Sequence, residues 1–173
     1  MEEIVRTLGV AKGTVYHYFD SKEELLDAVV ENLADEYVGV LTQIAKEVRG
    51  TALERLRTLI GASRVTETQG ETLEGLHRPG NIGLHARLLA LLLKKMAPLY
   101  ATIIEEGCKE GSFRTEHPLE VAEILLAGIQ LMTDVGFYPW DKPDLARRAS
   151  AIPALVEAQL GAAKGSFSFV VPV

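Results

Sequence analysis

Chemically versatile side chains gather near the start of the chain, in the stretch LGVAKGTVYHYFDSKEEL at residues 8–25. It combines lysine, hydroxyl, imidazole and phenol groups, and no acidic residue occurs between Ile4 and Phe19. Hydroxyl and phenol groups donate hydrogen bonds to phosphate oxygens, a lysine neutralises phosphate charge, and a lysine also suits the guanine acceptors of the major groove. The stretch therefore suggests contact with a nucleic acid. The alternative is that its aromatic residues belong to an ordinary helical hairpin.

Two short helices are expected to position these groups. The first covers residues 1–8 and ends at Gly9, which can adopt the left-handed conformation that reverses a chain. The second covers residues 11–19, where Val15 and Phe19 are four positions apart and face the same core. Two short helices joined at a glycine are typical of a helix-turn-helix, whose second helix enters a DNA major groove.

A long amphipathic helix is predicted to follow. Ser21 and Glu24 have the spacing of a capping box, and apolar residues then recur at three- and four-residue steps as far as Val48. Thr51 and Glu54 repeat the capping pattern and predict a second helix that ends in the middle sixties.

Prolines and glycines divide the rest of the chain. The pattern predicts an irregular connector over 66–83 and helices over 84–96, 98–110, 118–136 and 143–160. Pro98 is expected in the first turn of its helix, and Gly111 is expected to end that helix. No segment gives a convincing strand, although the tail SFSFVV alternates. We therefore expect an all-α fold.

Composition narrows the class of protein. The chain has 173 residues, of which 47% are hydrophobic and 24% charged, which suits one compact globular unit. Its longest apolar runs are much shorter than the roughly 20 residues of a membrane span, and no signal peptide is recognisable, so we expect a cytoplasmic protein with no membrane partner. The net charge is −6, so any nucleic-acid contact must be local. The single cysteine, Cys108, excludes an intrachain disulfide framework.

Enzyme motifs are absent from the sequence. There is no Gly-x-Ser-x-Gly elbow, phosphate loop or His-Glu-x-x-His pair, and Glu105 and Glu106 are interpreted as part of a solvated face. His77 and His85 could hold a metal only with a third ligand that the sequence does not identify. We therefore expect no enzymatic activity, no metal and no cofactor.

The segment LGVAKGTVYHYFDSKEELLDAVV resembles the DNA-binding signature of the tetracycline-repressor (TetR) family of bacterial transcriptional regulators. The residues that match the family spacing are Gly9, Val10, Gly13, Thr14, Tyr16, Phe19, Lys22 and Leu25. The resemblance implies an all-helical homodimer that binds a double-stranded DNA operator. By the same resemblance, Thr14, Tyr16 and Lys22 hold phosphates, and the base-reading surface contains Lys12, Gly13, His17 and Tyr18.

The resemblance also implies a division of the chain and a mode of regulation. Residues 1–40 would form the helix-turn-helix head and the start of a connecting helix, and residues 41–173 a helical bundle for effector binding and dimerisation. A small apolar or amphipathic effector would shift the connecting helix and separate the two heads. The function expected is that of a repressor released from its operator by such an effector.

Candidate effector-binding residues are polar or adaptable side chains on apolar helices. They are Tyr37, Leu59, Ser63, Leu92, Met96, Tyr100, Ile103 and Gln130, and each could equally belong to an ordinary core. The candidate dimer interface is an intersubunit four-helix bundle. It comprises Leu125, Leu126, Gly128, Ile129, Met132, Ile152, Leu155, Val156 and Leu160, with burial inside one subunit as the alternative.

Two departures from the family pattern affect the head. Ala11 stands where the family often has a capping serine, and loss of such a cap costs about 1 kcal/mol. The family also places a full helix before the helix-turn-helix, whereas this sequence starts at Met1 in what corresponds to the second helix, so the three-helix head is expected to be incomplete. Either the true start lies upstream, or the protein is a helical, dimeric small-molecule-binding protein that has lost DNA binding.

Overall fold

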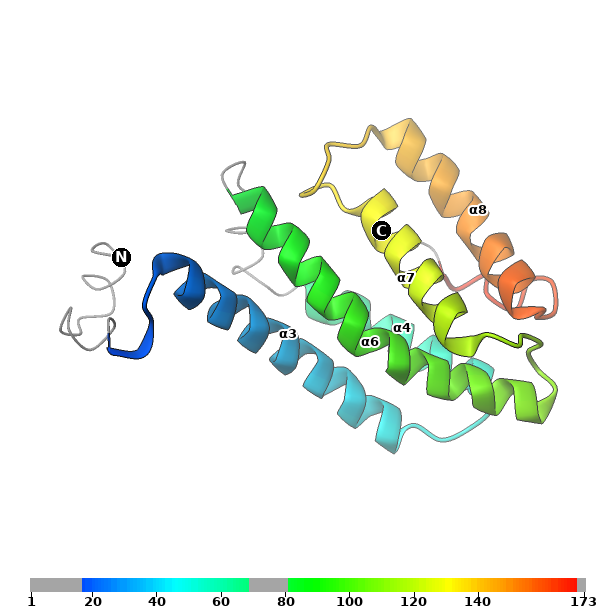
Figure 1. Cartoon of the computed structure of the whole chain (residues 1–173). Helices are drawn as coiled ribbons and strands as arrows, with labels where there is room; N and C mark the ends of the chain where they lie inside the picture. The colour runs from blue at the N-terminus through cyan, green and yellow to red at the C-terminus, as the bar shows by residue number, and fades with distance from the viewer. Residues whose placement is uncertain (1–16, 69–80, 171–173) are drawn as a thin grey trace.

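The computed structural model describes residues 17–68 and 81–170, apart from the side chains of residues 64–68. Five helices occupy most of this part of the chain (Figure 1). They are α3 (Lys22–Glu47), α4 (Ala52–Thr68), α6 (Ile82–Glu110), α7 (Pro118–Thr133) and α8 (Lys142–Leu160). No strand occurs in either described segment, which confirms the all-α expectation.

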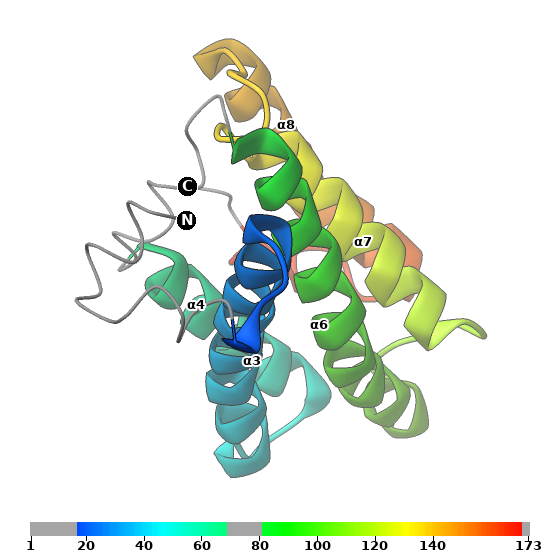
Figure 2. The ribbon, with the colours of Figure 1, turned by 60° about the vertical axis from the view of Figure 1, so that its left-hand side comes forward.

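Helix α6 lies at the centre of the arrangement. It packs against α3 and α4 on one side and against α7 on the other, and α8 covers α7. Figure 2 shows α6 between the α3–α4 pair and the α7–α8 pair. The buried residues of α6 include Tyr100, Ala101, Ile103 and Ile104, whose adjacent positions point to different neighbours. Neighbours on two sides therefore bury most of the circumference of α6, while Arg87, Lys94 and Glu105 lie on one exposed face.

Both predicted capping patterns open a helix. The Ser21 hydroxyl accepts a hydrogen bond from the Glu24 backbone N–H at 3.0 Å, and α3 starts there. The Glu24 carboxylate accepts from the backbone N–H of Asp20 at 2.6 Å, one residue earlier than in a standard capping box. At α4, the Thr51 hydroxyl accepts from the Glu54 N–H at 3.3 Å, and the Glu54 carboxylate accepts from the Thr51 N–H at 2.8 Å.

The predicted break at Pro98 is wrong, because α6 continues through this residue. A proline inside a helix removes one backbone hydrogen bond and crowds the preceding turn. Here Pro98 faces solvent, while Met96, Ala97 and Tyr100 on either side of it are buried in the core. Packing of these flanking residues therefore holds the helix together. The predicted end is confirmed, since Gly111 follows the helix with a φ of 81°.

Helix α8 buries one narrow stripe of apolar residues and, next to it, Glu157. Ile152, Val156 and Leu160 are buried at four-residue steps, whereas Leu155 is 58% exposed. The turns after α8 return to the core. Phe167 is fully buried against the rings of Phe113 and Phe169 and is one of the largest buried side chains.

None of the helices in the described ranges has the length and apolar character needed to cross a membrane.

Candidate functional site

The part of the DNA-binding signature within the described residues covers the segment just before α3 and the first turns of that helix. His17 and Tyr18 are exposed, and their rings meet edge to face with centroids 5.1 Å apart. Lys22 is the exposed first residue of α3. These three groups are available to an approaching ligand. The other predicted DNA contacts, Lys12, Gly13, Thr14 and Tyr16, lie outside the described residues.

Helix α3 connects this end of the molecule with the rest. It is continuous across the expected domain boundary at residues 40 and 41 and runs parallel to α6 (Figure 1). Near its start, Asp27 pairs with Arg87, and two turns later Asp35 pairs with Lys95. Both pairs join residues 60 positions apart, so the two helices keep one register over this length.

A small apolar cluster lies between these two ion pairs. Val30 and Ala34 of α3 are fully buried against Leu88 of α6. Exposed ion pairs of this kind contribute little to stability, about 0–1 kcal/mol each, whereas burial of the apolar side chains contributes more. The cluster therefore contributes most of the free energy that holds the first half of α3 against α6. The ion pairs fix the register of the two helices. A movement of α6 would therefore also move the first turns of α3.

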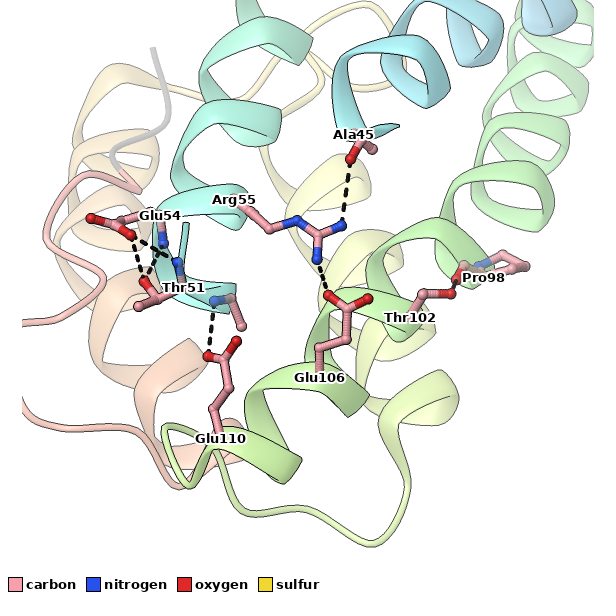
Figure 3. A network of polar contacts seen from close by, with 9 residues as sticks. Ala45, Thr51, Glu54, Arg55, Pro98, Thr102, Glu106 and Glu110 are labelled. Atoms are coloured by element: carbon pink, nitrogen blue, oxygen red, sulfur yellow. Dashed lines mark hydrogen bonds and ion pairs between the residues drawn. The ribbon is translucent and has the colours of Figure 1, made fainter. Parts of the chain in front are cut away.

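A second connection joins the other end of α3 to α4 and α6. The Arg55 guanidinium of α4 pairs with Glu106 of α6 and donates to the Ala45 carbonyl of α3 at 3.4 Å (Figure 3). Arg55 Nε is buried and has no hydrogen-bond partner within the described part of the chain. The backbone N–H of Ala52 donates to Glu110 at 3.0 Å. One arginine thus links all three helices.

The turn before α4 is shaped by Gly50 and by the cap that follows it. Gly50 has a φ of 119°, and a Cβ there would lie 2.5 Å from the Glu54 carboxylate, so a side chain would be strained and crowded. Glu54 is fully exposed, and the hydrogen bond from the Thr51 backbone N–H, helped by the Thr51 hydroxyl, holds its pKa below its ordinary value. The negative charge of this cap is therefore retained in mildly acidic solution.

An open cleft of about 400 Å³ lies beside Arg55, at the meeting point of α3, α4 and α6. We call it the junction cleft. Its apolar lining includes Val48, Leu99 and Ile103, and its charged lining consists of Lys46, Arg49, Arg55 and Glu106. Of these residues, only Ile103 was predicted from the sequence to bind an effector, because no local motif connects positions that come together from three helices.

The other predicted effector residues are divided between the core and its edge. Leu59, Met96 and Tyr100 are buried members of the main core, and Tyr37 and Leu92 are half-buried against it. The Tyr37 hydroxyl donates to the Ser63 carbonyl at 3.2 Å, and the Ser63 hydroxyl donates to the Ile60 carbonyl at 2.8 Å. Gln130 is half-buried on α7.

The predicted dimer residues also fall into two groups. Ile152, Val156 and Leu160 are buried within this protomer, whereas Gly128, Met132 and Leu155 are exposed. Leu125, Leu126 and Ile129 are half-buried and pack against the core. Ile124 and Leu131, which the predicted interface did not include, are 68% and 44% exposed. Together with Gly128 they follow an i, i+4, i+7 pattern that places them on one side of α7.

A buried histidine lies away from the junction cleft. His85 is 1% exposed, and its Nε2 lies 2.9 Å from a carboxylate oxygen of Asp134, which joins the start of α6 to the end of α7. Within the described ranges, no group of three His, Cys, Asp or Glu side chains is arranged to hold a metal ion. His77 lies outside the described residues. The half-buried Cys108 thiol lies 3.7 Å from the Thr115 carbonyl.

Comparisons with known proteins agree with this architecture. Residues 64–155 match the family of tetracyclin repressor-like C-terminal domains, and residues 1–29 match the bacterial regulatory proteins of the tetR family. The HTH-type transcriptional repressor KstR2 of Rhodococcus jostii is 25% identical over 132 residues, which cover 70% of this chain and 61% of the relative. KstR2 of Mycolicibacterium smegmatis is 27% identical over 128 residues, which cover 67% of this chain and 58% of the relative.

The chain thus spans about three fifths of the length of these two repressors. The C-terminal match alone includes more than half of the chain and contains all of α6 and α7. On this ground the chain belongs to the TetR family of bacterial regulatory proteins.

Proposed function

We propose that this protein is a transcriptional repressor that binds a double-stranded DNA operator and is released from it by a small apolar or amphipathic effector. The observation that carries the proposal is the match of residues 1–29 to the tetR regulatory family, at the segment that supplies the DNA-contacting residue types. The two distant repressor relatives support the same role. A cytoplasmic location follows, because the operator is there.

The division of labour follows the course of α3. We infer that residues 1–40 form the head and the start of the connecting helix, and that residues 41–173 carry effector binding and dimerisation. Lys12, Gly13, His17 and Tyr18 would face the bases, and Thr14, Tyr16 and Lys22 the phosphates. The exposure of His17, Tyr18 and Lys22 supports this assignment.

The outward side of α7 supports a dimer. Ile124, Gly128 and Leu131 form an exposed apolar face of α7 that a second copy would cover. The neighbouring helix α8 carries a further exposed leucine, Leu155. We therefore propose that Ile124, Gly128, Leu131 and Leu155 form the centre of the interface. Ile152, Val156 and Leu160 would support it from within each protomer.

The dimer is tested by sedimentation velocity of the Ile124→Glu variant. Two glutamates facing each other across a twofold axis repel and lose water, so we expect a shift from dimer to monomer with an unchanged helical circular dichroism spectrum. Glu123→Gln, at the neighbouring exposed position, is the control and should remain dimeric. A dimeric Ile124→Glu variant would place the interface elsewhere.

DNA binding is tested by fluorescence anisotropy on the DNA upstream of the protein's own gene. We expect saturable binding that is tighter than binding to scrambled DNA and weakens steeply with salt, because phosphate contacts release counterions. Lys22→Ala should weaken binding to both DNAs and lower the salt slope by about 1. Lys142→Ala, an exposed lysine at the start of α8, is the control. Equal affinity for both DNAs would contradict a sequence-specific repressor, and no binding at all would favour a protein that only binds small molecules.

A further inference from the structure

The charges around the junction cleft do not balance. Arg55 and Glu106 pair with each other, which neutralises both. Lys46 and Arg49 remain, and neither makes an ion pair with any residue that the structure describes. Both are exposed at the edge of the cleft. The cleft therefore has an excess of positive charge in a protein whose net charge is −6.

The uncharged lining is mixed: Thr42, Gly50 and Thr102 lie beside the apolar residues Ala45, Val48, Leu99 and Ile103. The half-buried Leu99 of α6 offers apolar surface to the cleft, whereas Ala45 and Ile103 are buried beneath it. The open cleft, with a volume of about 400 Å³, has room for a small molecule. A site with an apolar wall and a cationic edge fits a ligand that has an apolar body and an anionic end.

We propose that the junction cleft binds an amphipathic carboxylate that acts as an effector. The carboxylate is held by Lys46 and Arg49, and the apolar chain lies against Leu99, above the buried Ile103. Arg55 completes the wall beneath the ligand and keeps α3, α4 and α6 together.

The position of the cleft gives this ligand access to the DNA-binding end. Ala45 and Lys46 belong to the last turn of α3, and Lys22 at the other end follows the segment that carries His17 and Tyr18. A helix of 26 residues is about 39 Å long, and when such a helix pivots near its middle, a displacement of one end moves the other end by a similar distance in the opposite direction. Ligand entry between α3 and α6 would therefore displace the head. This regulatory part rests on the proposed function.

The site is tested by calorimetric titration of the full chain with octanoate, with 1-octanol as the uncharged probe. We expect one saturable site for octanoate and weaker binding of the alcohol. Lys46→Gln/Arg49→Gln should weaken octanoate binding by about tenfold or more, because charge-assisted hydrogen bonds are lost. Lys94→Gln/Lys142→Gln removes the same charge from exposed positions away from the cleft and should bind like the wild type.

A second variant keeps the charges and fills the space. Thr102 is exposed and lines the cleft, so Thr102→Trp should block octanoate while circular dichroism shows an unchanged helix content. Absent or non-saturable octanoate binding, equal binding of octanol, or binding that survives both cleft variants would each overturn the proposal.

The regulatory role needs one further measurement. Octanoate should weaken operator binding of the wild type and leave that of Thr102→Trp unchanged. Octanoate binding with no change in operator affinity would overturn the effector role. If the chain without octanoate binds no operator, the proposed function fails, and the calorimetric titration still decides whether the cleft is a ligand site.

Discussion

Gly107 lies in the last turn of α6, before the turn that leads to α7. Packing around it decides whether replacement by alanine raises or lowers the free energy of unfolding. A Cβ added at Gly107 would overlap the Cδ2 atom of Phe113 and lie 3.0 Å from the Cβ of Ala52. Phe113 is 4% exposed and packs against the fully buried Phe167. The ring therefore has little space into which it can move.

Two effects of Gly107→Ala oppose each other. Alanine is favoured over glycine inside a helix by about 1 kcal/mol. Overpacking of a well-packed core costs about 1–3 kcal/mol, and the overlap with a buried ring favours the upper part of this range. We expect a net loss of about 1–2 kcal/mol in the free energy of unfolding.

Urea denaturation at a fixed protein concentration measures this change. Gly39→Ala is the matched control, because Gly39 lies within α3 and its added Cβ would meet no atom within 4 Å. We expect this control to gain about 0.5–1 kcal/mol. A stabilised Gly107→Ala variant, with a midpoint that rises as in Gly39→Ala, would refute the packing described around Phe113.

Three further predictions concern stability. Phe167→Ala should lower the free energy of unfolding by about 3–5 kcal/mol in urea titration, because it empties a fully buried site; a loss below about 1 kcal/mol would contradict that burial. His85→Phe should cost about 1–3 kcal/mol by the same assay, because the Asp134 carboxylate loses its imidazole partner, and an unchanged midpoint would show that the contact contributes nothing. The lowered pKa of Glu54 stabilises the fold above its unfolded-state pKa, and this contribution is lost as pH falls through the folded-state pKa. Between about pH 6 and pH 3 the melting temperature of Glu54→Gln should therefore fall less than that of the wild type, and parallel curves would contradict the cap.

Features encoded by neighbouring residues could be predicted from the sequence. The caps at Ser21 and Thr51 and the helix end at Gly111 each depend on groups only a few positions apart. Pro118 also marks the start of α7 correctly. Local hydrogen bonds and the special conformation of glycine decide these boundaries, so short patterns identify them.

Features that depend on distant packing could not be predicted. Pro98 has the local signature of a helix start, but core packing on both sides carries α6 through it. On α8, Leu155 and Val156 have similar apolar character, and only the neighbouring helix α7 and the final turns decide which of them is buried. The tail around Phe167 reads as a possible strand, yet it forms turns that return to the core.

The candidate site likewise combines features encoded by neighbouring residues with features that depend on distant packing. The sequence of residues 8–25 identifies the family and supplies the residue types proposed to contact DNA. The junction cleft gave no such signal, because Lys46, Arg55 and Glu106 are far apart in sequence and meet only after α3, α4 and α6 have packed. Predicted effector residues such as Leu59 and Met96 share the apolar surroundings of a core, and pattern alone does not separate the two roles.

Hydroxyl-radical footprinting of the DNA upstream of the protein's own gene tests the central claim most directly, because it reports where the chain contacts the duplex. We expect two protected half-sites related by twofold symmetry, with centres about 34–36 Å apart or a multiple of this distance. Uniform protection, or none from a chain shown to be helical and dimeric, would contradict a sequence-specific repressor.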